Sequence, residues 1–214
     1  MKSLRPFSLA LLLFCAPVLA QEPVRDYVRE AGTGLPLYRA RVADAYGNRF
    51  NGTYLLDNEG FKLGELCYEG KVYSGILLHF DAAAQRVLLQ QEGSPVMLDL
   101  GRDHIDWFVR DGRRFENLPA RGVQLPDGFY EVVAQGQGAV YRRVDKRRLS
   151  LPDPNSSARG FIGYDDPNYK EGLMDYYSPK ESWYQIKEDG SIKRLRSKRS
   201  IQNAIQYVRT QTAH

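Results

Sequence analysis

Residues 64–115 alternate short apolar runs with turn-forming pairs, and this stretch constrains the fold more than any other part of the chain. Its runs are rich in Val, Ile, Leu, Tyr, Phe and Trp, the residue types most enriched in strands. The turn-forming pairs are Glu69-Gly70, Asp81-Ala82, Glu92-Gly93, Gly101-Arg102 and Asp111-Gly112. Apolar runs broken at such regular intervals predict an antiparallel β-meander.

The alternation within this stretch is one-sided. Over residues 71–80 the even-numbered positions are mostly apolar and the odd-numbered positions are mixed, and residues 87–89, 96–100 and 105–109 repeat the pattern. A sheet that packs one face on a core gives this pattern. We therefore predict a mainly β fold, in which an antiparallel meander forms a curved sheet or barrel-like domain with one C-terminal α-helix. Such regularity is typical of scaffold, so we expect function to lie elsewhere.

The first 20 residues predict a signal peptide. Lys2 and Arg5 give a positive start, residues 9–14 give an apolar centre, and Val18-Leu19-Ala20 gives small residues at a cleavage site. Residues 8–19 are too short to cross roughly 30 Å of hydrocarbon, so we expect no transmembrane segment in the mature chain. The protein is expected to be secreted across the inner membrane to the periplasm or outer envelope.

We predict a single β-rich domain over residues 21–214. The expected parts are the main meander at 50–149, a long loop at 150–170, further strands within 171–195 and a terminal helix at 197–211. The further strands are expected at 173–177 and 182–187, with a tight turn at Asp189-Gly190 before the next short strand.

An apolar stripe predicts the terminal helix. Ile201, Ala204, Ile205 and Val208 recur at the spacing of one helical face. Ser197 or Ser200 can cap its start, and we expect it to dock over an open end or edge of the sheet.

Charge and cysteine content narrow the function classes. Without Lys2 and Arg5 the 30 basic residues fall to 28 against 26 acidic residues, a net charge of +2 that does not favour nucleic acid as a partner. Only Cys67 remains after cleavage, so no intramolecular disulfide can form. A lone cysteine in a strand is most often a small buried hydrophobe. A nucleophilic Cys67 would need His79 or His104 beside it.

No motif assigns a catalytic residue or a cofactor. The chain has no G-x-S-x-G elbow, P-loop, dinucleotide fingerprint or H-E-x-x-H. His104 and Asp106 lie two apart on one strand, but a metal would need further ligands. Asp165, Asp166 and Asn168 lack the spacing of a calcium-binding EF-hand loop. We predict no catalytic site, no cofactor and no metal.

Aromatic residues and interleaved cations are concentrated between residues 161 and 184. Tyr and Trp with a few cations are typical of binding surfaces. They are also common strand residues, so packing within the sheet is the alternative interpretation. The predicted ligand-binding residues are Tyr164, Tyr169, Tyr176, Tyr177 and Trp183.

Three stretches carry a resemblance to known proteins. They are residues 69–81 (EGKVYSGILLHFD), residues 128–132 (GFYEV) and the C-terminal layout of residues 183–187 (WYQIK), the Asp189-Gly190 turn and residues 198–201 (KRSI). Together they resemble a group of uncharacterised secreted β-rich bacterial envelope proteins with a C-terminal helix and no assigned activity. The resemblance implies an envelope location and a single β-domain, and it carries no functional residues.

We therefore expect a non-enzymatic envelope protein that binds a ligand or a partner, through residues 151–170 and the aromatics after them. The partner would be a cell-envelope component or another envelope protein. One alternative is a carboxylate-dependent hydrolase acting on glycan or cell-wall material, which needs two carboxyl groups about 5–10 Å apart. Another is a structural or assembly protein that pairs through a sheet edge.

Overall fold

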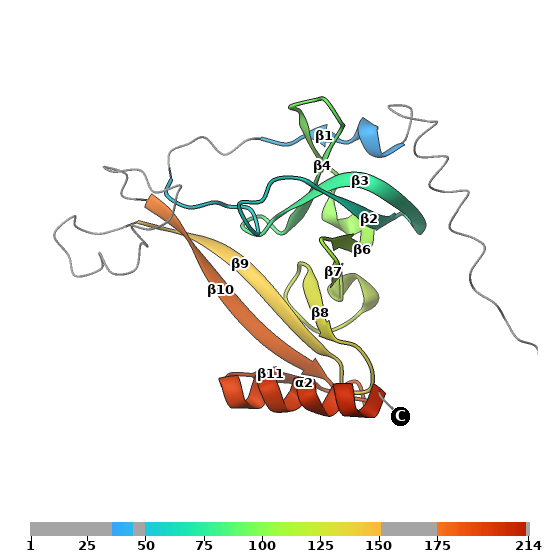
Figure 1. Cartoon of the computed structure of the whole chain (residues 1–214), viewed down its shortest axis with the longest axis vertical. Coiled ribbons are helices and arrows are strands. Elements are labelled where there is room, and N and C mark those ends of the chain that lie inside the picture. The colour runs from blue at the N-terminus through green and yellow to red at the C-terminus, as the bar shows by residue number, and fades with distance from the viewer. Residues whose placement is uncertain (1–35, 45–49, 151–174, 213–214) are drawn as a thin grey trace, which may run out of the picture.

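The structure, a computed structural model, describes residues 36–44, 50–150 and 175–212 (Figure 1). Its strands are β1 Arg41–Val42, β2 Lys62–Tyr68, β3 Lys71–Asp81, β4 Arg86–Gln90, β5 Met97–Asp99, β6 Ile105–Arg110, β7 Arg113–Glu116, β8 Tyr130–Ala134, β9 Val140–Ser150, β10 Asp175–Ile186 and β11 Ile192–Leu195. Helix α2 spans Lys198–Thr212, and short 3-10 turns cover Pro36–Arg39 (η2), Arg102–His104 (η3) and Pro119–Arg121 (η4).

All eleven strands belong to one antiparallel sheet, in the order β1-β5-β4-β3-β2-β6-β7-β8-β9-β10-β11. Two meanders, one of β2 to β5 and one of β6 to β11, are joined where β2 pairs with β6. At that junction Leu66 lies opposite Tyr73 of β3 and opposite Phe108 of β6. The two ends of the sheet do not pair with each other, so the sheet is open. This confirms the predicted mainly β fold with a C-terminal helix, and the sheet is not a closed barrel. The predicted signal peptide lies outside the described residues.

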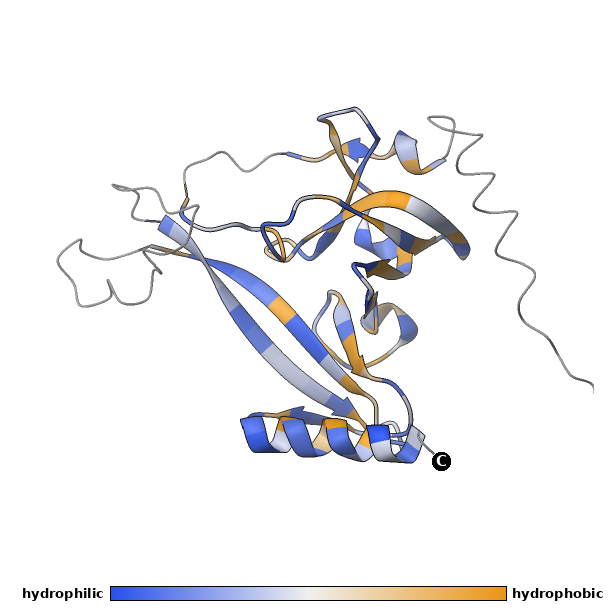
Figure 2. Ribbon diagram, in the orientation of Figure 1, coloured by the Kyte–Doolittle hydropathy of each residue, from blue (hydrophilic) through white to orange (hydrophobic). Residues whose placement is uncertain are grey.

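The main core is aromatic and lies under the first half of the sheet. Phe80, Phe108, Phe115 and Phe129 are fully or almost fully buried together. The rings of Phe108 and Phe115 stack at 4.6 Å between centroids, and Phe129 meets Phe108 edge-on at 5.2 Å. Figure 2 shows the corresponding hydrophobic colouring along β3. Offset and edge-on ring pairs stabilise a core beyond the area they bury.

A second, smaller core lies at the other end of the sheet, where α2 runs across the ends of the last strands (Figure 1). Its buried members are Ala134, Val140, Leu195, Ala204 and Val208. Ile201 and Ile205 pack against it from the same helical stripe. The structure therefore has the predicted docked helix, at Lys198–Thr212 where residues 197–211 were expected.

Ser197 caps this helix through a reciprocal pair of hydrogen bonds. The backbone N–H of Ser200 donates to Ser197 Oγ at 3.1 Å, and the N–H of Ser197 donates to Ser200 Oγ at 3.2 Å. This is the geometry of a capping box, with Ser200 in the position usually held by Glu or Gln. Both serines proposed as caps therefore act together.

The expectation of separate strands at 173–177 and 182–187 is wrong, because β10 runs unbroken through Pro179. Pro179 lies opposite Lys146 of β9, and β11 begins to pair with β10 only at Trp183. At Pro179 the strand is therefore an edge, where a missing N–H breaks no ladder bond.

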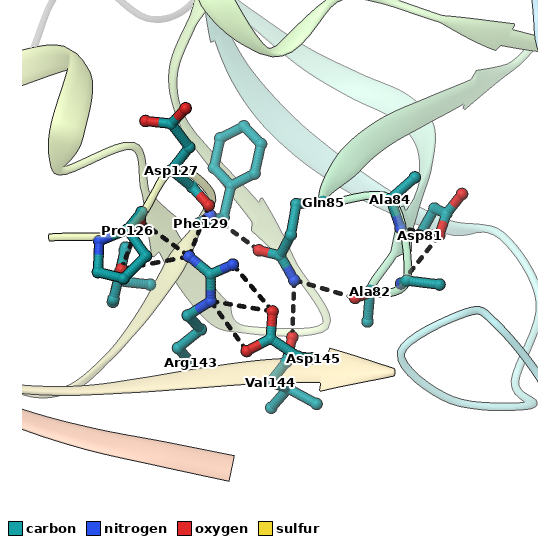
Figure 3. Close-up of polar contacts among 12 residues, drawn as sticks. Asp81, Ala82, Ala84, Gln85, Pro126, Asp127, Phe129, Arg143, Val144 and Asp145 are labelled. Carbon is teal, nitrogen blue, oxygen red and sulfur yellow. Dashed lines mark hydrogen bonds and ion pairs between the residues drawn. The ribbon is translucent and has the colours of Figure 1, made fainter. Parts of the chain in front are cut away.

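A buried amide ties the two halves of the sheet together (Figure 3). The side chain of Gln85, in the turn after β3, donates to the carbonyls of Ala82 at 3.0 Å and Val144 at 2.8 Å. Its Oε1 accepts the backbone N–H of Phe129 at 3.1 Å. The N–H of Lys146 on β9 also donates to Ala82 O at 3.1 Å. These bonds hold the sheet curved although its ends stay apart.

Arg143 anchors the same region from β9 (Figure 3). Its guanidinium donates to the backbone carbonyls of Pro126 at 2.8 Å and Asp127 at 2.6 Å, and to the carboxylate of Asp145 at 2.8 Å. Arg143 also donates to the hydroxyl of Tyr130 at 3.2 Å. The loop between β7 and β8 is thereby fastened to the sheet.

Candidate functional site

The three predicted ligand-binding residues that the structure describes do not form one cluster. Tyr164 and Tyr169 lie outside the described residues, whereas Tyr176, Tyr177 and Trp183 are half-buried on β10. Side chains alternate along a strand, so Tyr177 and Trp183 share one face and Tyr176 takes the other. Six residues also separate Tyr177 from Trp183, a distance of about 20 Å at strand rise.

Tyr177 packs within the protein. Its ring lies 5.5 Å from that of Phe50 and 6.2 Å from that of Tyr54, and its backbone N–H donates to Asn51 O at 2.9 Å. The guanidinium of Arg148 lies over the Phe50 ring at 4.9 Å. This environment matches the alternative interpretation, in which an aromatic strand residue packs within the sheet.

Trp183 lies at the rim of the second core. In the sheet it stands between Arg142 of β9 and Leu195 of β11, and the Arg142 guanidinium lies 5.6 Å from its ring centroid. Its indole N–H donates to Glu181 at 3.2 Å. Of the three described candidates, Trp183 is the one beside the helix end of the sheet.

A groove of about 610 Å³ lies at that end, between α2 and the β10–β11 hairpin. The hairpin provides its floor, the helix provides one wall, and the turn between β8 and β9 closes one end. Its lining residues are Gly138, Gln185, Lys187, Glu188, Asp189, Lys193, Leu195, Ser200, Asn203, Ala204 and Tyr207.

Local sequence explains how the groove forms. Asp189-Gly190 makes the tight turn of the hairpin, with Gly190 at φ 77° and Asp189 Oδ1 accepting the N–H of Ser191 at 2.8 Å. The pairing places Gln185 directly opposite Lys193. The Ser197 cap then starts α2 two residues after β11 ends, so the helix turns back over the hairpin.

Gly138 shapes the closed end of the groove. Its φ of 76° is in the left-handed region that favours glycine. A Cβ there would lie 3.2 Å from the side-chain nitrogen of Gln185 and 3.7 Å from the Tyr207 ring. Gln185 donates to Gly138 O at 3.2 Å. The turn and the floor are therefore in close contact.

The lining combines hydrogen-bonding groups with one exposed ring. Tyr207 is 50% exposed, although it is a large aromatic residue. Asn203 is exposed one helical turn before it, and Lys187 and Lys193 are exposed on the floor. Within the described ranges neither lysine forms an ion pair. An aromatic ring beside exposed lysines and amides is a lining able to bind a polar ligand.

Two carboxylates, Glu188 and Asp189, stand at the exposed tip of the hairpin. Hydrogen bonds from the side chain and backbone of Ser191 lower the pKa of Asp189. A glycosidase acid requires a raised pKa. The Asp189 carboxyl therefore gives no support to carboxylate catalysis in this groove.

A smaller hollow of about 450 Å³ adjoins the groove at the β8–β9 turn. It is lined by residues 136–139 of that turn together with Tyr141 and Ile186, and it shares Lys187 and Glu188 with the larger groove. The two hollows are therefore neighbours at the end of β10.

Charged clusters elsewhere on the sheet are compensated. Glu131 is buried and lies 2.9 Å from Arg113 and 2.6 Å from Arg142. Burial favours the protonated form of Glu131, but the hydrogen bonds from both arginines outweigh it and lower the pKa of Glu131. The carboxylate stays ionised and paired, which suits a structural role.

A second buried cluster joins β3, β6 and the segment before β2. Arg110 is 1% exposed and donates to both carboxylate oxygens of Asp57, at 2.8 and 3.0 Å, and to the carbonyls of Leu78 and Gly60. His79 is fully buried beside it, with Nε2 3.8 Å from Asp57 Oδ1. The cluster clamps residues 57–60 onto the sheet.

The protonation state of His79 follows from its contacts. The backbone N–H of Phe80 donates to His79 Nδ1 at 2.8 Å, so the neutral ring carries its proton on Nε2. That Nε2 has no hydrogen-bond partner. Burial, reinforced by the charge of Arg110, lowers the pKa of His79 to about 4.

Cys67 is a buried strand residue, as expected of a lone cysteine. Its thiol donates to Asp106 Oδ2 at 3.3 Å, and burial together with that carboxylate raises the pKa of Cys67. A raised pKa disfavours the thiolate that a nucleophile requires. Across residues 36–44, 50–150 and 175–212 no group of His, Cys, Asp and Glu side chains is arranged to hold a metal ion.

Sequence reasoning missed the residues that define the groove. Asn203 and Tyr207 lie on α2 outside the apolar stripe that predicted the helix, and Lys193 lies on the short strand β11. Their spacing of four residues places Asn203 and Tyr207 on the same side of α2. An exposed Tyr on an otherwise polar helix face was the one available signal.

The chain matches no protein-family model, no curated protein and no solved structure. The resemblance to secreted envelope proteins therefore remains a prediction from the sequence. Among the described residues no helix has the length and apolar character to cross a membrane.

Proposed function

We propose that the protein is a non-enzymatic binding protein of the cell envelope, and that its ligand occupies the groove between α2 and the β10–β11 hairpin. The observation that carries this proposal is the groove itself, with the half-exposed Tyr207 beside Asn203, Lys187 and Lys193. Its volume of about 610 Å³ falls within the range of roughly 300–1,000 Å³ that is usual for ligand sites.

The setting of the groove supports binding without chemistry. Its walls are a capped helix and a paired hairpin, which hold side chains more firmly than loops do. The envelope location rests on the predicted signal peptide. Trp183, the described candidate nearest to α2, contributes to the core beneath the groove and does not line it.

No observation favours the two alternatives. Asp189 at the hairpin tip has a lowered pKa, which is contrary to what a hydrolase acid requires. Where β10 has no partner on its outer side, Pro179 removes a backbone donor that an added strand would need. Neither hydrolysis nor edge pairing is therefore preferred.

Ligand-observed NMR tests the proposal with a panel of soluble probes: a neutral trisaccharide, an acidic trisaccharide, a short peptide and a phosphorylated sugar. Asn203→Trp places a large ring in the groove, and Gln206→Trp places the same ring on α2 outside the lining. We expect at least one probe to bind the wild-type protein and Gln206→Trp but to lose its signal with Asn203→Trp.

The proposal is contradicted if no probe binds the wild-type protein, or if Asn203→Trp binds as well as Gln206→Trp. Both positions are exposed, so equal melting temperatures are expected and confirm that the loss is not caused by unfolding.

A further inference from the structure

We infer that the groove takes an acidic glycan, meaning a short stretch of sugar chain that carries a carboxylate or a phosphate. This inference rests on the function proposed above and names the chemistry of its ligand. Three features of the lining carry it: an exposed aromatic ring, the amide groups of two further lining residues, and an exposed lysine, Lys193, that forms no ion pair within the described residues.

The aromatic ring is that of Tyr207. Half of this residue is exposed, and its ring lies close enough to the β8–β9 turn that a Cβ added at Gly138 would be 3.7 Å from it. A ring held against a turn offers one flat face to a ligand. The apolar face of a sugar ring covers such a surface, while its hydroxyls remain free to form hydrogen bonds at the rim.

The amides of Gln185 and Asn203 lie on the floor and on the wall, respectively. Gln185 uses its side-chain nitrogen to donate to Gly138 O at 3.2 Å, which leaves its Oε1 directed elsewhere as an acceptor. An amide provides both donors and acceptors, so these two side chains can donate hydrogen bonds to sugar hydroxyls or accept hydrogen bonds from them.

The lysines of the groove differ from the arginines of the sheet. Arg86, Arg110, Arg113, Arg142 and Arg143 each lie within 3.3 Å of a carboxylate oxygen. Within the described part of the chain Lys193 has no such partner, whereas Lys187 lies near the lining carboxylate Asp189 and, after the hydrogen bonds from Ser191, helps to lower the pKa of Asp189. A ligand with an anionic group would supply the missing charge.

Further cations continue from the groove toward the start of α2. They are exposed and form no ion pair within residues 36–44, 50–150 and 175–212: Arg194, Arg196, Lys198 and Arg199. Clustered charges of one sign raise the local concentration of oppositely charged ligands. An anionic chain longer than the groove would therefore be attracted by these cations where it extends beyond the groove toward the start of α2.

Isothermal titration calorimetry with four probes tests the inference: trigalacturonate, which carries carboxylates; maltotriose, its neutral counterpart; glucose 6-phosphate; and a short oligothymidylate as a polyanion without a sugar-face match. We expect trigalacturonate or glucose 6-phosphate to bind at least about tenfold more tightly than maltotriose, the effect of one charge-assisted hydrogen bond. Which of the two binds distinguishes carboxylate from phosphate.

Variants then assign the contacts. Lys193→Gln should weaken acidic-probe binding about tenfold and leave maltotriose unchanged, whereas Tyr207→Ala should weaken both and Tyr207→Phe should restore them. Lys180→Gln, on the part of β10 outside the groove, is the matched control and should bind as the wild-type protein does.

Four results would overturn the inference. If maltotriose binds as tightly as the acidic probes, the inference of an acidic ligand fails and the proposed function still stands. If oligothymidylate binds as tightly as the acidic sugars, and Lys180→Gln weakens binding as much as Lys193→Gln does, the surface binds polyanions non-specifically. Binding that survives in Asn203→Trp would overturn the inference and the proposed function together. No binding by any of the four probes would overturn the inference, and the proposed function would fall as well if the short peptide also failed to bind.

Discussion

The two ends of the sheet have hydrophobic cores of different residue types. Under β2 to β7 the core is built from four phenylalanines, and even an arginine, Arg110, is fully enclosed and paired. Under β8 to β11 the core consists of small aliphatic residues and is covered by one helix, which leaves Tyr207 and the hairpin lysines at the surface. The first end pairs its buried arginine with a carboxylate, although His79 Nε2 there has no hydrogen-bond partner, and the second end keeps its polar groups exposed along the groove. This difference separates scaffold from candidate site.

The largest effect is expected from a core substitution in the aromatic half. Phe108→Ala should lower the free energy of unfolding by about 3–5 kcal/mol, because Phe108 contacts three other buried rings. Val208→Ala in the helix core removes two methyl groups and should cost about 2 kcal/mol. Chemical denaturation of both variants measures the two changes. A larger loss of stability in Val208→Ala than in Phe108→Ala would contradict the assignment of the aromatic half as the scaffold.

A pH-dependent effect is expected from His79. Its pKa is about 4 when folded and 6.5 ordinarily, so the unfolded chain binds a proton first as the pH falls. Stability is therefore full above pH 6.5 and is lost as the pH falls toward 4, by about 3 kcal/mol at 1.4 kcal/mol per pH unit. Denaturation at pH 7, 6 and 5 measures this slope.

His79→Asn removes the titrating group and should flatten the slope between pH 6.5 and 5. His104→Asn is the control, because His104 is exposed and faces Glu69 on the surface, and it should keep the slope. Losses below about pH 4.5 should persist in both variants, since the lowered pKa values of Asp57 and Glu131 make their stabilising contacts acid-sensitive there. A wild-type slope in His79→Asn would contradict the buried neutral imidazole.

An intermediate effect is expected where the two halves are joined. Gln85→Ala leaves the Phe129 N–H and the carbonyls of Ala82 and Val144 without this partner, and should cost about 1–3 kcal/mol. The loss should appear as one cooperative transition, because both halves depend on the same bonds. Two separated transitions would show that the amide does not couple them.

The smallest effect is expected at the helix cap. Ser197→Ala removes the acceptor for the Ser200 N–H and should lower stability by about 1 kcal/mol. Amide exchange should speed up in the first turn of α2 and stay unchanged in β2 to β7. Faster exchange throughout the sheet would mean that the helix supports the aromatic core as well.

Much of the fold could be predicted because its signals are local. The one-sided alternation at residues 71–80 indicated β3, and the stripe from Ile201 to Val208 indicated α2, since each pattern depends only on neighbours in the chain. The pairing of β2 with β6 brings Leu66 against Phe108 across 42 positions, and nothing in either strand specifies that partner. The continuous β10 was missed because Pro179 is read as a break unless the strand is known to be an edge.

The groove was not predicted from the sequence for a related reason. Residue type drew attention to the tyrosines, but the ring of Tyr177 packs on Phe50 and Tyr54, which are more than 120 positions away. Tyr207 and Asn203 looked like ordinary helix surface. Their role depends on where the Ser197 cap turns the helix relative to the hairpin, which is a property of the assembled fold.

The most direct test of the separation between scaffold and site is an amide chemical-shift map of the isotope-labelled protein, titrated with the tighter-binding of trigalacturonate and glucose 6-phosphate. The account predicts saturable shifts confined to residues 185–195 and 200–207 and to Gly138, with β2 to β7 unchanged. Shifts centred on Tyr176 and Tyr177, or spread over β2 to β7, would contradict it.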